Sequence, residues 1–149
     1  AVKSGAFATQ APPEEEPIAG LRSLRFAPDG APRGHMLQLH GGGFRIGRPE
    51  FEAPLCERLA ARCGIEIVVP QYRLSPEAPF PAGLNDALAA LAALRARIGE
   101  DAALIVGGDS AGGGLAASLG FLSSIGRAPR IDALVLLSPW LDLTVSAPS

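Results

Sequence analysis

The sequence has no long hydrophobic run: within its 149 residues, no apolar stretch approaches the roughly 18 residues that a membrane-spanning helix needs. It also has no excess of one charge. Its 13 Lys and Arg residues stand against 15 Asp and Glu residues, so no strongly basic surface for nucleic acid is expected. Glycine (18) and proline (14) are abundant but show no G-X-Y period, which excludes collagen. A content of 48% apolar and 19% charged residues is typical of one globular domain.

Cysteine and histidine are scarce, with two residues of each. Cys56 and Cys63 lie in one predicted helix with their Cα atoms roughly 10 Å apart, beyond the ~7 Å that a disulfide allows. We therefore expect two buried free thiols, and no metal site, because no second Cys or His pair stands at ligand spacing. Residues 1–19 contain no secretory signal and are expected to form a mobile N-terminal arm. Free thiols and the missing signal together favour a cytoplasmic protein.

Short β-type runs alternate with helical patterns along the rest of the chain. Strands are expected near residues 21–26, 35–40, 65–69, 104–106 and 133–137, and helices near 51–63, 82–98 and from the glycine turn at 107–112 to about 125. This alternation predicts an α/β fold with a mostly parallel sheet flanked by helices. The apolar runs are nearly continuous, as in strands that are covered on both faces.

Residues 108–112 match the pattern G-x-S-x-G, with an apolar strand before it and a helix after it. Such a serine sits on a sharp strand-to-helix turn that exposes its Oγ atom, and Gly108 and Gly112 would avoid collisions there. The N-terminus of the helix would direct its N–H groups and its positive dipole end toward a developing oxyanion. Ser110 is therefore predicted to be a nucleophile.

Two other interpretations fit the residues of this turn. The glycines could simply close a tight corner between a strand and a helix. Gly112, Gly114 and Ala117 also match the dinucleotide fingerprint G-x-G-x-x-A, with Asp132 about 20 residues further on as a ribose ligand. Residues 109–111 separate the strand from these glycines, and Asp132 precedes its strand, so the cofactor interpretation is disfavoured and no cofactor is expected.

A second glycine-rich segment follows the strand at 35–40, where Gly41, Gly42 and Gly43 stand in a row after His40. Consecutive glycines are costly in entropy, but they suit a loop whose backbone N–H groups must face a ligand. The N–H groups of Gly42, Gly43 and Ala111 would form an oxyanion hole with three donors. For His40 we expect a side chain that pins the loop and transfers no proton.

Four ordered segments carry a resemblance to a known family: residues 40–44, 72–82, 108–113 and 138–144. They are similar to the signatures of the hormone-sensitive-lipase-like esterases, a branch of the α/β-hydrolases. The resemblance implies a carboxylesterase that cleaves short- to medium-chain acyl esters without a metal or cofactor. It assigns Ser110 as nucleophile and Gly42, Gly43 and Ala111 as oxyanion donors. It makes Asp109 a structural support of the serine turn, together with the glycines around it.

The same family takes its triad acid and histidine from loops that would lie beyond Ser149, and the only histidines here are His35 and His40. Residues 20–149 are therefore expected to form the N-terminal half of an α/β-hydrolase domain, incomplete at its C-terminal side. A second polypeptide or a missing C-terminal segment would complete the triad for a small acyl-ester substrate. The alternative is an inert truncated hydrolase whose open sheet edge pairs with itself, as a homo-oligomer, or with a partner.

Overall fold

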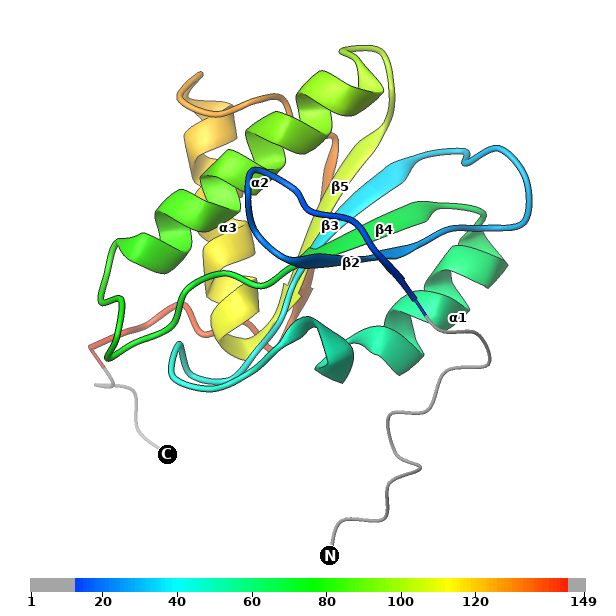
Figure 1. Ribbon diagram of the computed structural model, residues 1–149. Coiled ribbons are helices and arrows are strands. Elements are labelled where there is room, and N and C mark those ends of the chain that lie inside the picture. The colour runs from blue at the N-terminus through cyan, green and yellow to red at the C-terminus, as the bar shows by residue number, and fades with distance from the viewer. Residues whose placement is uncertain (1–12, 145–149) are drawn as a thin grey trace, which may run out of the picture.

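The computed structural model describes residues 13–144, which form a six-stranded sheet in the order β1-β2-β4-β3-β5-β6 with helices on both faces (Figure 1). The strands are β1 (Glu14–Glu15), β2 (Ser23–Phe26), β3 (His35–Leu39), β4 (Glu66–Pro70), β5 (Leu104–Asp109) and β6 (Ala133–Leu137). The helices are the 3-10 turn η1 (Pro49–Phe51), α1 (Ala53–Cys63), α2 (Ala82–Ile98) and α3 (Ser110–Ser124). The predicted α/β fold with a mostly parallel sheet is confirmed.

The parallel part of the sheet fixes where the two glycine segments lie. Strand β3 pairs in parallel with β4 and β5, and β5 pairs in parallel with β6, whereas β1 and β2 are antiparallel additions. In the register of β3 and β5, His35 lies opposite Leu104 and Leu39 lies opposite Gly108. The loops that follow the two strands therefore leave the same edge of the sheet, as carboxyl ends of parallel strands do.

The strands divide their side chains between two cores because successive residues point to opposite faces. On β3, Leu37 and Leu39 pack with α2 and α3, while Met36 packs with α1. The same alternation places Val106 in the first core and Ile105 against the second. Figure 1 shows this layering, with α1 on one side of the sheet and α2 and α3 on the other.

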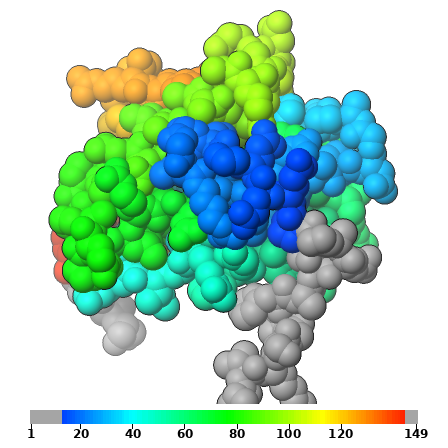
Figure 2. Space-filling view, viewed as in Figure 1, coloured from blue at the N-terminus to red at the C-terminus, as the bar shows by residue number. Residues whose placement is uncertain are grey.

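The N-terminal boundary differs from the prediction. The arm was expected to reach residue 19, but Glu14–Glu15 pair with β2 and the side chain of Ile18 is only 6% exposed. Hydrogen bonds to the β2 edge and burial of Ile18 draw this segment onto the fold, where it lies beside α2 (Figure 2). The remainder of the predicted arm, residues 1–12, lies outside the described residues.

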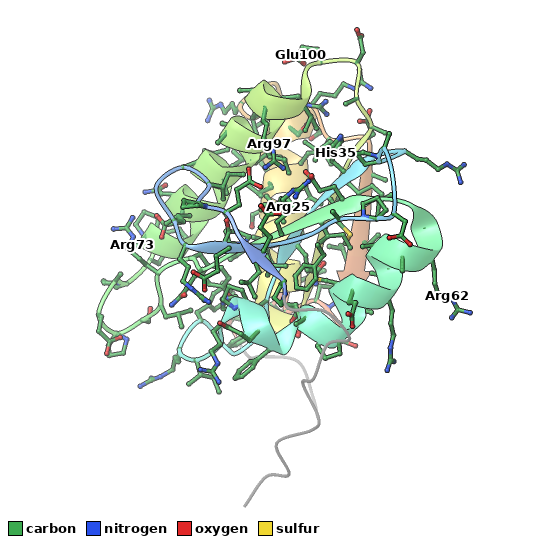
Figure 3. The ribbon with its side chains drawn as sticks, turned by 45° about the vertical axis from the view of Figure 1, so that its right-hand side comes forward. Arg25, His35, Arg62, Arg73, Arg97 and Glu100 are labelled. Carbon is green, nitrogen blue, oxygen red and sulfur yellow. The ribbon has the colours of Figure 1, made fainter. Side chains whose placement is uncertain are left out.

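An ionic cluster centred on Glu66 ties this region together. Glu66 accepts hydrogen bonds from Arg25 Nε at 2.7 Å and from Arg97, and its carboxylate lies 3.3 Å from His35 Nδ1. Arg97 also donates to Glu16 at 2.8 Å. Burial alone would raise the pKa of Glu66, but the hydrogen bond from Arg25 and the charges of the two arginines hold that pKa below its usual value. Figure 3 shows Arg25, His35 and Arg97 meeting there from three elements.

The two cysteines are free, but only Cys56 is buried. The expectation of two buried thiols is wrong for Cys63, the last residue of α1, which is exposed. Gly64 then ends the helix in the left-handed conformation at φ +65°, as predicted. Cys63 follows Cys56 and Ala60 on the same helical stripe, but it is the last residue of α1, and only the other two belong to the buried core.

Candidate active site

The serine turn is a tight corner between β5 and α3. Ser110 is the first residue of α3 and has φ +49°, a left-handed conformation that is unusual for a residue other than glycine. A Cβ atom on Gly108 would lie 2.4 Å from the carbonyl carbon of Gly112, and one on Gly112 would lie 2.0 Å from the carbonyl oxygen of Leu39. Both glycines are therefore required by close backbone packing, and the second contact presses α3 against the end of β3.

The glycine loop after β3 lies directly against this corner. A Cβ atom on Gly41 would lie 2.2 Å from Asp109 Oδ2. Gly42 has φ +124° and its carbonyl accepts hydrogen bonds from the N–H groups of Arg45 and Ile46. Gly43 has φ +62° and open space where a Cβ would be. The loop thus has the conformation of a turn that only glycines adopt easily, with its backbone facing the serine corner.

The backbone donors of both segments are available for a ligand. Within residues 13–144, the N–H groups of Gly42 and Gly43 donate to no backbone carbonyl. Ala111 lies in the first turn of α3, where an N–H group has no acceptor within its own helix. The structure therefore brings the three predicted oxyanion donors to one edge of the sheet, next to Ser110.

His40 anchors the glycine loop. Its ring is fully buried, stacks on Tyr72 with 4.2 Å between centroids, and has Nδ1 2.9 Å from the carbonyl oxygen of Gly41. Tyr72 Oη donates to the carbonyl of His40 at 2.6 Å. Burial lowers the pKa of His40, although the backbone carbonyl and nearby Asp109 oppose this shift, so the neutral ring is favoured. These contacts support the predicted pinning role.

The proline-rich segment 72–82 braces the loop from the other side. Arg73 binds Asp86 of α2 through Nε at 2.9 Å and through its terminal nitrogen at 2.7 Å. The N–H group of Ser75 donates to the carbonyl of Phe44 at 2.8 Å. The glycine loop is therefore held to α2 by this segment as well as to the sheet by His40.

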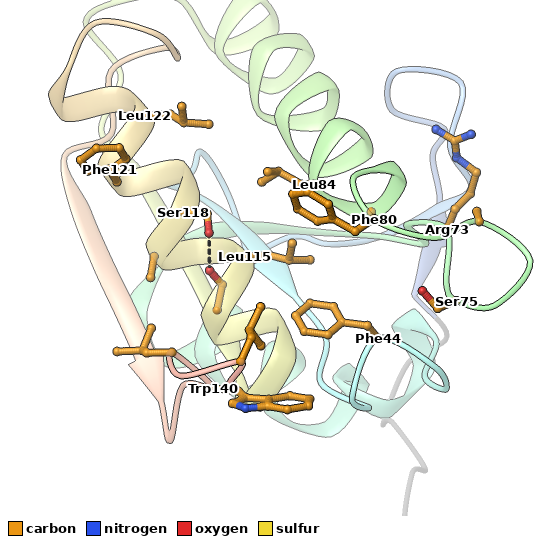
Figure 4. A pocket seen from close by; sticks show the side chains of 16 residues that line it. Phe44, Arg73, Ser75, Phe80, Leu84, Leu115, Ser118, Phe121, Leu122 and Trp140 are labelled. Carbon is orange, nitrogen blue, oxygen red and sulfur yellow. Dashed lines mark hydrogen bonds between the residues drawn. The ribbon is translucent and has the colours of Figure 1, made fainter. Parts of the chain in front are cut away.

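An apolar cavity of about 610 Å³ opens between α2, α3 and the segment after β6 (Figure 4). Its lining includes Phe44, next to the glycine loop, and Phe121, further along α3. The rings of Phe44 and Trp140 lie 5.8 Å apart between centroids, and the N–H group of Trp140 donates to the carbonyl of Ser110 at 2.8 Å. One end of the cavity is thus tied to the serine corner.

The contacts of Asp132 explain its position without a ribose. It accepts a hydrogen bond from the N–H group of Leu104 at 2.8 Å and one from Arg130 Nε at 2.8 Å. It precedes β6, at the edge opposite the glycine segments, where the start of β5 also lies. The close approach of Gly114 to the carbonyl oxygen of Trp140, 2.6 Å from where a Cβ would sit, accounts for that glycine by packing.

Two polar residues beneath the serine corner belong to no motif of the sequence. Glu52 and Gln38 are both buried, and Gln38 Nε2 donates to Glu52 Oε2 at 2.9 Å. A glutamine inside the apolar run of β3 was the available signal, since a buried amide needs a polar partner.

In the described part of the chain, no group of three or more His, Cys, Asp or Glu side chains is arranged to hold a metal ion. No helix there is long and apolar enough to cross a membrane.

Comparisons with known proteins agree with this geometry. The chain belongs to the alpha/beta hydrolase fold family, whose model matches residues 36–149. It is similar to a solved hormone-sensitive lipase from a metagenome library, with a TM-score of 0.83 and 38% identity over 92% of this chain and 46% of that one. The predicted relationship to the hormone-sensitive-lipase-like esterases is confirmed.

Curated relatives carry esterase names. An acetyl-hydrolase of Streptomyces hygroscopicus is 38% identical over 115 residues, 76% of this chain and 38% of that protein. An ethyl acetate hydrolase of Pseudomonas putida is 35% identical over 145 residues, 93% of this chain and 41% of that protein. The chain therefore spans less than half the length of these relatives.

Proposed function

We propose that this chain carries the nucleophile and oxyanion hole of a serine carboxylesterase that cleaves short- to medium-chain acyl esters. The observation that carries the proposal is Ser110 at φ +49°, on a strand-to-helix corner packed against the glycine loop. Such backbone strain is retained where the surrounding structure enforces it, and it exposes the serine oxygen above the sheet. The names of the relatives support an ester substrate.

In the proposed reaction, Ser110 Oγ attacks the ester carbonyl carbon and loses its proton to a general base. The carbonyl oxygen becomes an oxyanion and accepts hydrogen bonds from the N–H groups of Gly42, Gly43 and Ala111. Collapse of the intermediate expels the alcohol, and water then hydrolyses the acyl-enzyme. The apolar cavity beside Phe44 suits an apolar acyl or alcohol group.

We propose that neither histidine of the sequence is that base. His40 is buried in its contacts with Tyr72 and Gly41, and His35 lies at the start of β3, at the opposite edge of the sheet from Ser110. We propose that the triad acid and histidine come from a further segment or a second polypeptide, in line with the greater length of the relatives.

The face that such a segment would cover is apolar. Strand β6 pairs only with β5 among the described strands, and Leu134 and Leu137 are 41% and 45% exposed. Phe121 on the neighbouring helix α3 is 64% exposed. An apolar edge strand is a template for a further strand, so this surface supports the same proposal. It also favours the second candidate, an inert module that pairs with itself or a partner through β6.

Steady-state and burst kinetics with p-nitrophenyl acetate and butyrate separate the two candidates. The esterase proposal expects turnover of the full-length protein, with a burst of nitrophenol equal to the enzyme concentration wherever deacylation limits the rate. Ser110→Ala should abolish turnover, and the matched control Ser124→Ala, an exposed serine at the end of α3, should retain it. Equal activity in the two variants would contradict the role of Ser110, and a folded wild type without turnover would favour the module.

We also propose a location and a partner for the protein. A free, exposed thiol at Cys63 fits a reducing compartment such as the cytoplasm. Nothing beyond a small ester is needed as a partner for the chemistry, apart from the segment that completes the triad.

A further inference from the structure

A buried polar cluster lies between α1 and the sheet, on the face opposite the apolar cavity. Gln38 and Asp109 point to the same side of the sheet as Met36 and Ile105, because side chains on a strand alternate between its faces. Glu52 reaches the same place from the N-cap of α1. Two carboxyl groups and one amide from three elements therefore meet in the α1 core.

The carboxyl group of Glu52 is buried beside the polar side chains of its neighbours in this cluster. Glu52 is 8% exposed and accepts a hydrogen bond from Gln38 Nε2 at 2.9 Å through Oε2. The charge of the half-buried Asp109 and a side-chain hydrogen bond between the two groups both contribute to the raised pKa of Glu52. A carboxylate can only accept hydrogen bonds, so a hydrogen bond between two carboxyl groups needs a proton on one of them. Adjacent carboxylates also repel each other, which favours a single charge for the pair.

This pair lies under both halves of the candidate active site. Asp109 directly precedes Ser110. Its Oδ2 atom lies so close to the glycine loop that a Cβ atom on Gly41 would be only 2.2 Å from it. Displacement of the Asp109 carboxylate would therefore disturb the serine corner and the glycine loop together.

We propose that Glu52 is a positioning residue that shares a proton with Asp109 and thereby holds the Ser110 corner against the glycine loop. The role rests on the proposed esterase function. Glu52 touches neither the nucleophile nor the oxyanion site, and acts through Asp109.

Among residues 13–144, no cation contributes to the pKa of Glu52. The groups that face the pair are the thiol of Cys56 on α1, the phenol of Tyr72 and the ring of His40, each buried and favoured in its neutral form. Glu50 lies nearby but is neutralised by Arg22, at 2.7 Å.

Burial raises the pKa of Glu52 to about 7. The hydrogen bond from Gln38 opposes this shift, and the charge and hydrogen bond of Asp109 add to it. Above that pH, the pair gains a second negative charge next to the site where an oxyanion develops. Both the positioning hydrogen bond and the stabilisation of the oxyanion then weaken.

The test compares the pH dependence of kcat for p-nitrophenyl acetate in the full-length enzyme and in Glu52→Gln. Glutamine keeps a donor for Asp109 and an acceptor for Gln38 but cannot ionise. We expect kcat of the wild type to fall roughly tenfold between about pH 7 and pH 9, and the variant to lack this decline, with KM nearly unchanged in both. Glu50→Gln is the matched control and should keep the decline, because Glu50 is paired with Arg22.

A second measurement does not depend on turnover. In the wild type, the side-chain carboxyl ¹³C signal of Glu52 should titrate near pH 7, well above ordinary glutamates. A titration near the usual glutamate value, or superimposable kcat profiles of wild type and Glu52→Gln, would overturn the inference. If no ester is turned over at all, the esterase proposal fails, and the ¹³C titration still decides whether the pair shares a proton.

Discussion

Gly42 and Gly43 carry two of the expected oxyanion donors. Replacing each of them by alanine should lower the free energy of unfolding by very different amounts. Gly43 has φ +62° and nothing within 4 Å of an added Cβ, so Gly43→Ala should cost only the left-handed strain of about 1–2 kcal/mol. Gly42 has φ +124°, a conformation that costs other residues about 1–3 kcal/mol. A Cβ there would also lie 1.9 Å from the carbonyl oxygen of Ile46, and overpacking adds about 1–3 kcal/mol. We therefore expect Gly42→Ala to be less stable than Gly43→Ala by about 2–3 kcal/mol.

Urea denaturation followed by circular dichroism measures this difference directly. With a slope of about 1–3 kcal/mol per molar urea, the midpoint of Gly42→Ala should lie roughly 1–2 M below that of Gly43→Ala. The two variants add the same methyl group one residue apart, so each serves as the control for the other. Equal midpoints, or a lower midpoint for Gly43→Ala, would refute the loop conformation on which the oxyanion hole depends.

Two further predictions concern buried charged groups. The pKa of Glu52 is about 7 in the folded protein against a reference of 4.5, so the folded state binds its proton more tightly than the unfolded state does. The contribution of this group to the unfolding free energy is therefore fully present below pH 4.5 and is lost as the pH rises to 7. Relative to Glu52→Gln, the wild type should thus lose up to about 3 kcal/mol of unfolding free energy across this window, and a pH-independent difference would contradict the shift. Arg95 is 2% exposed and donates to the carbonyls of residues 99, 102 and 130 at 2.9, 2.7 and 2.7 Å. Arg95→Met should cost at least about 3 kcal/mol in a denaturation experiment, whereas exposed Arg62→Met (Figure 3) should change stability by less than about 0.5 kcal/mol; similar values for both would refute the anchoring role.

The fold could be predicted to a large extent because its signals are local. The β-branched run before Pro70 and the leucine stripe of residues 84–98 have the periodicities of a strand and a helix, and the structure places β4 and α2 there. The N-terminal boundary could not be predicted in this way. Pairing of Glu14–Glu15 with β2 and burial of Ile18 depend on partners distant in the sequence.

In the candidate site too, the residues in local motifs could be predicted and a residue brought in by tertiary packing could not. The motifs predicted that the N–H groups of Gly42, Gly43 and Ala111 would act together, and the parallel register of β3 and β5 explains why the two segments meet. The carboxyl group of Glu52 lay in an unremarkable acidic stretch of the sequence. Only the close packing of α1 on the sheet brings it to Asp109, and no local pattern reports that contact.

The most direct test of the central claim is covalent labelling of Ser110 by a fluorophosphonate probe, read by intact mass and peptide mapping of the full-length protein. The account predicts one probe per chain on Ser110, no label on Ser110→Ala, and unchanged labelling of Ser124→Ala. A folded wild-type protein that remains unlabelled, or a label that maps to another serine, would contradict it.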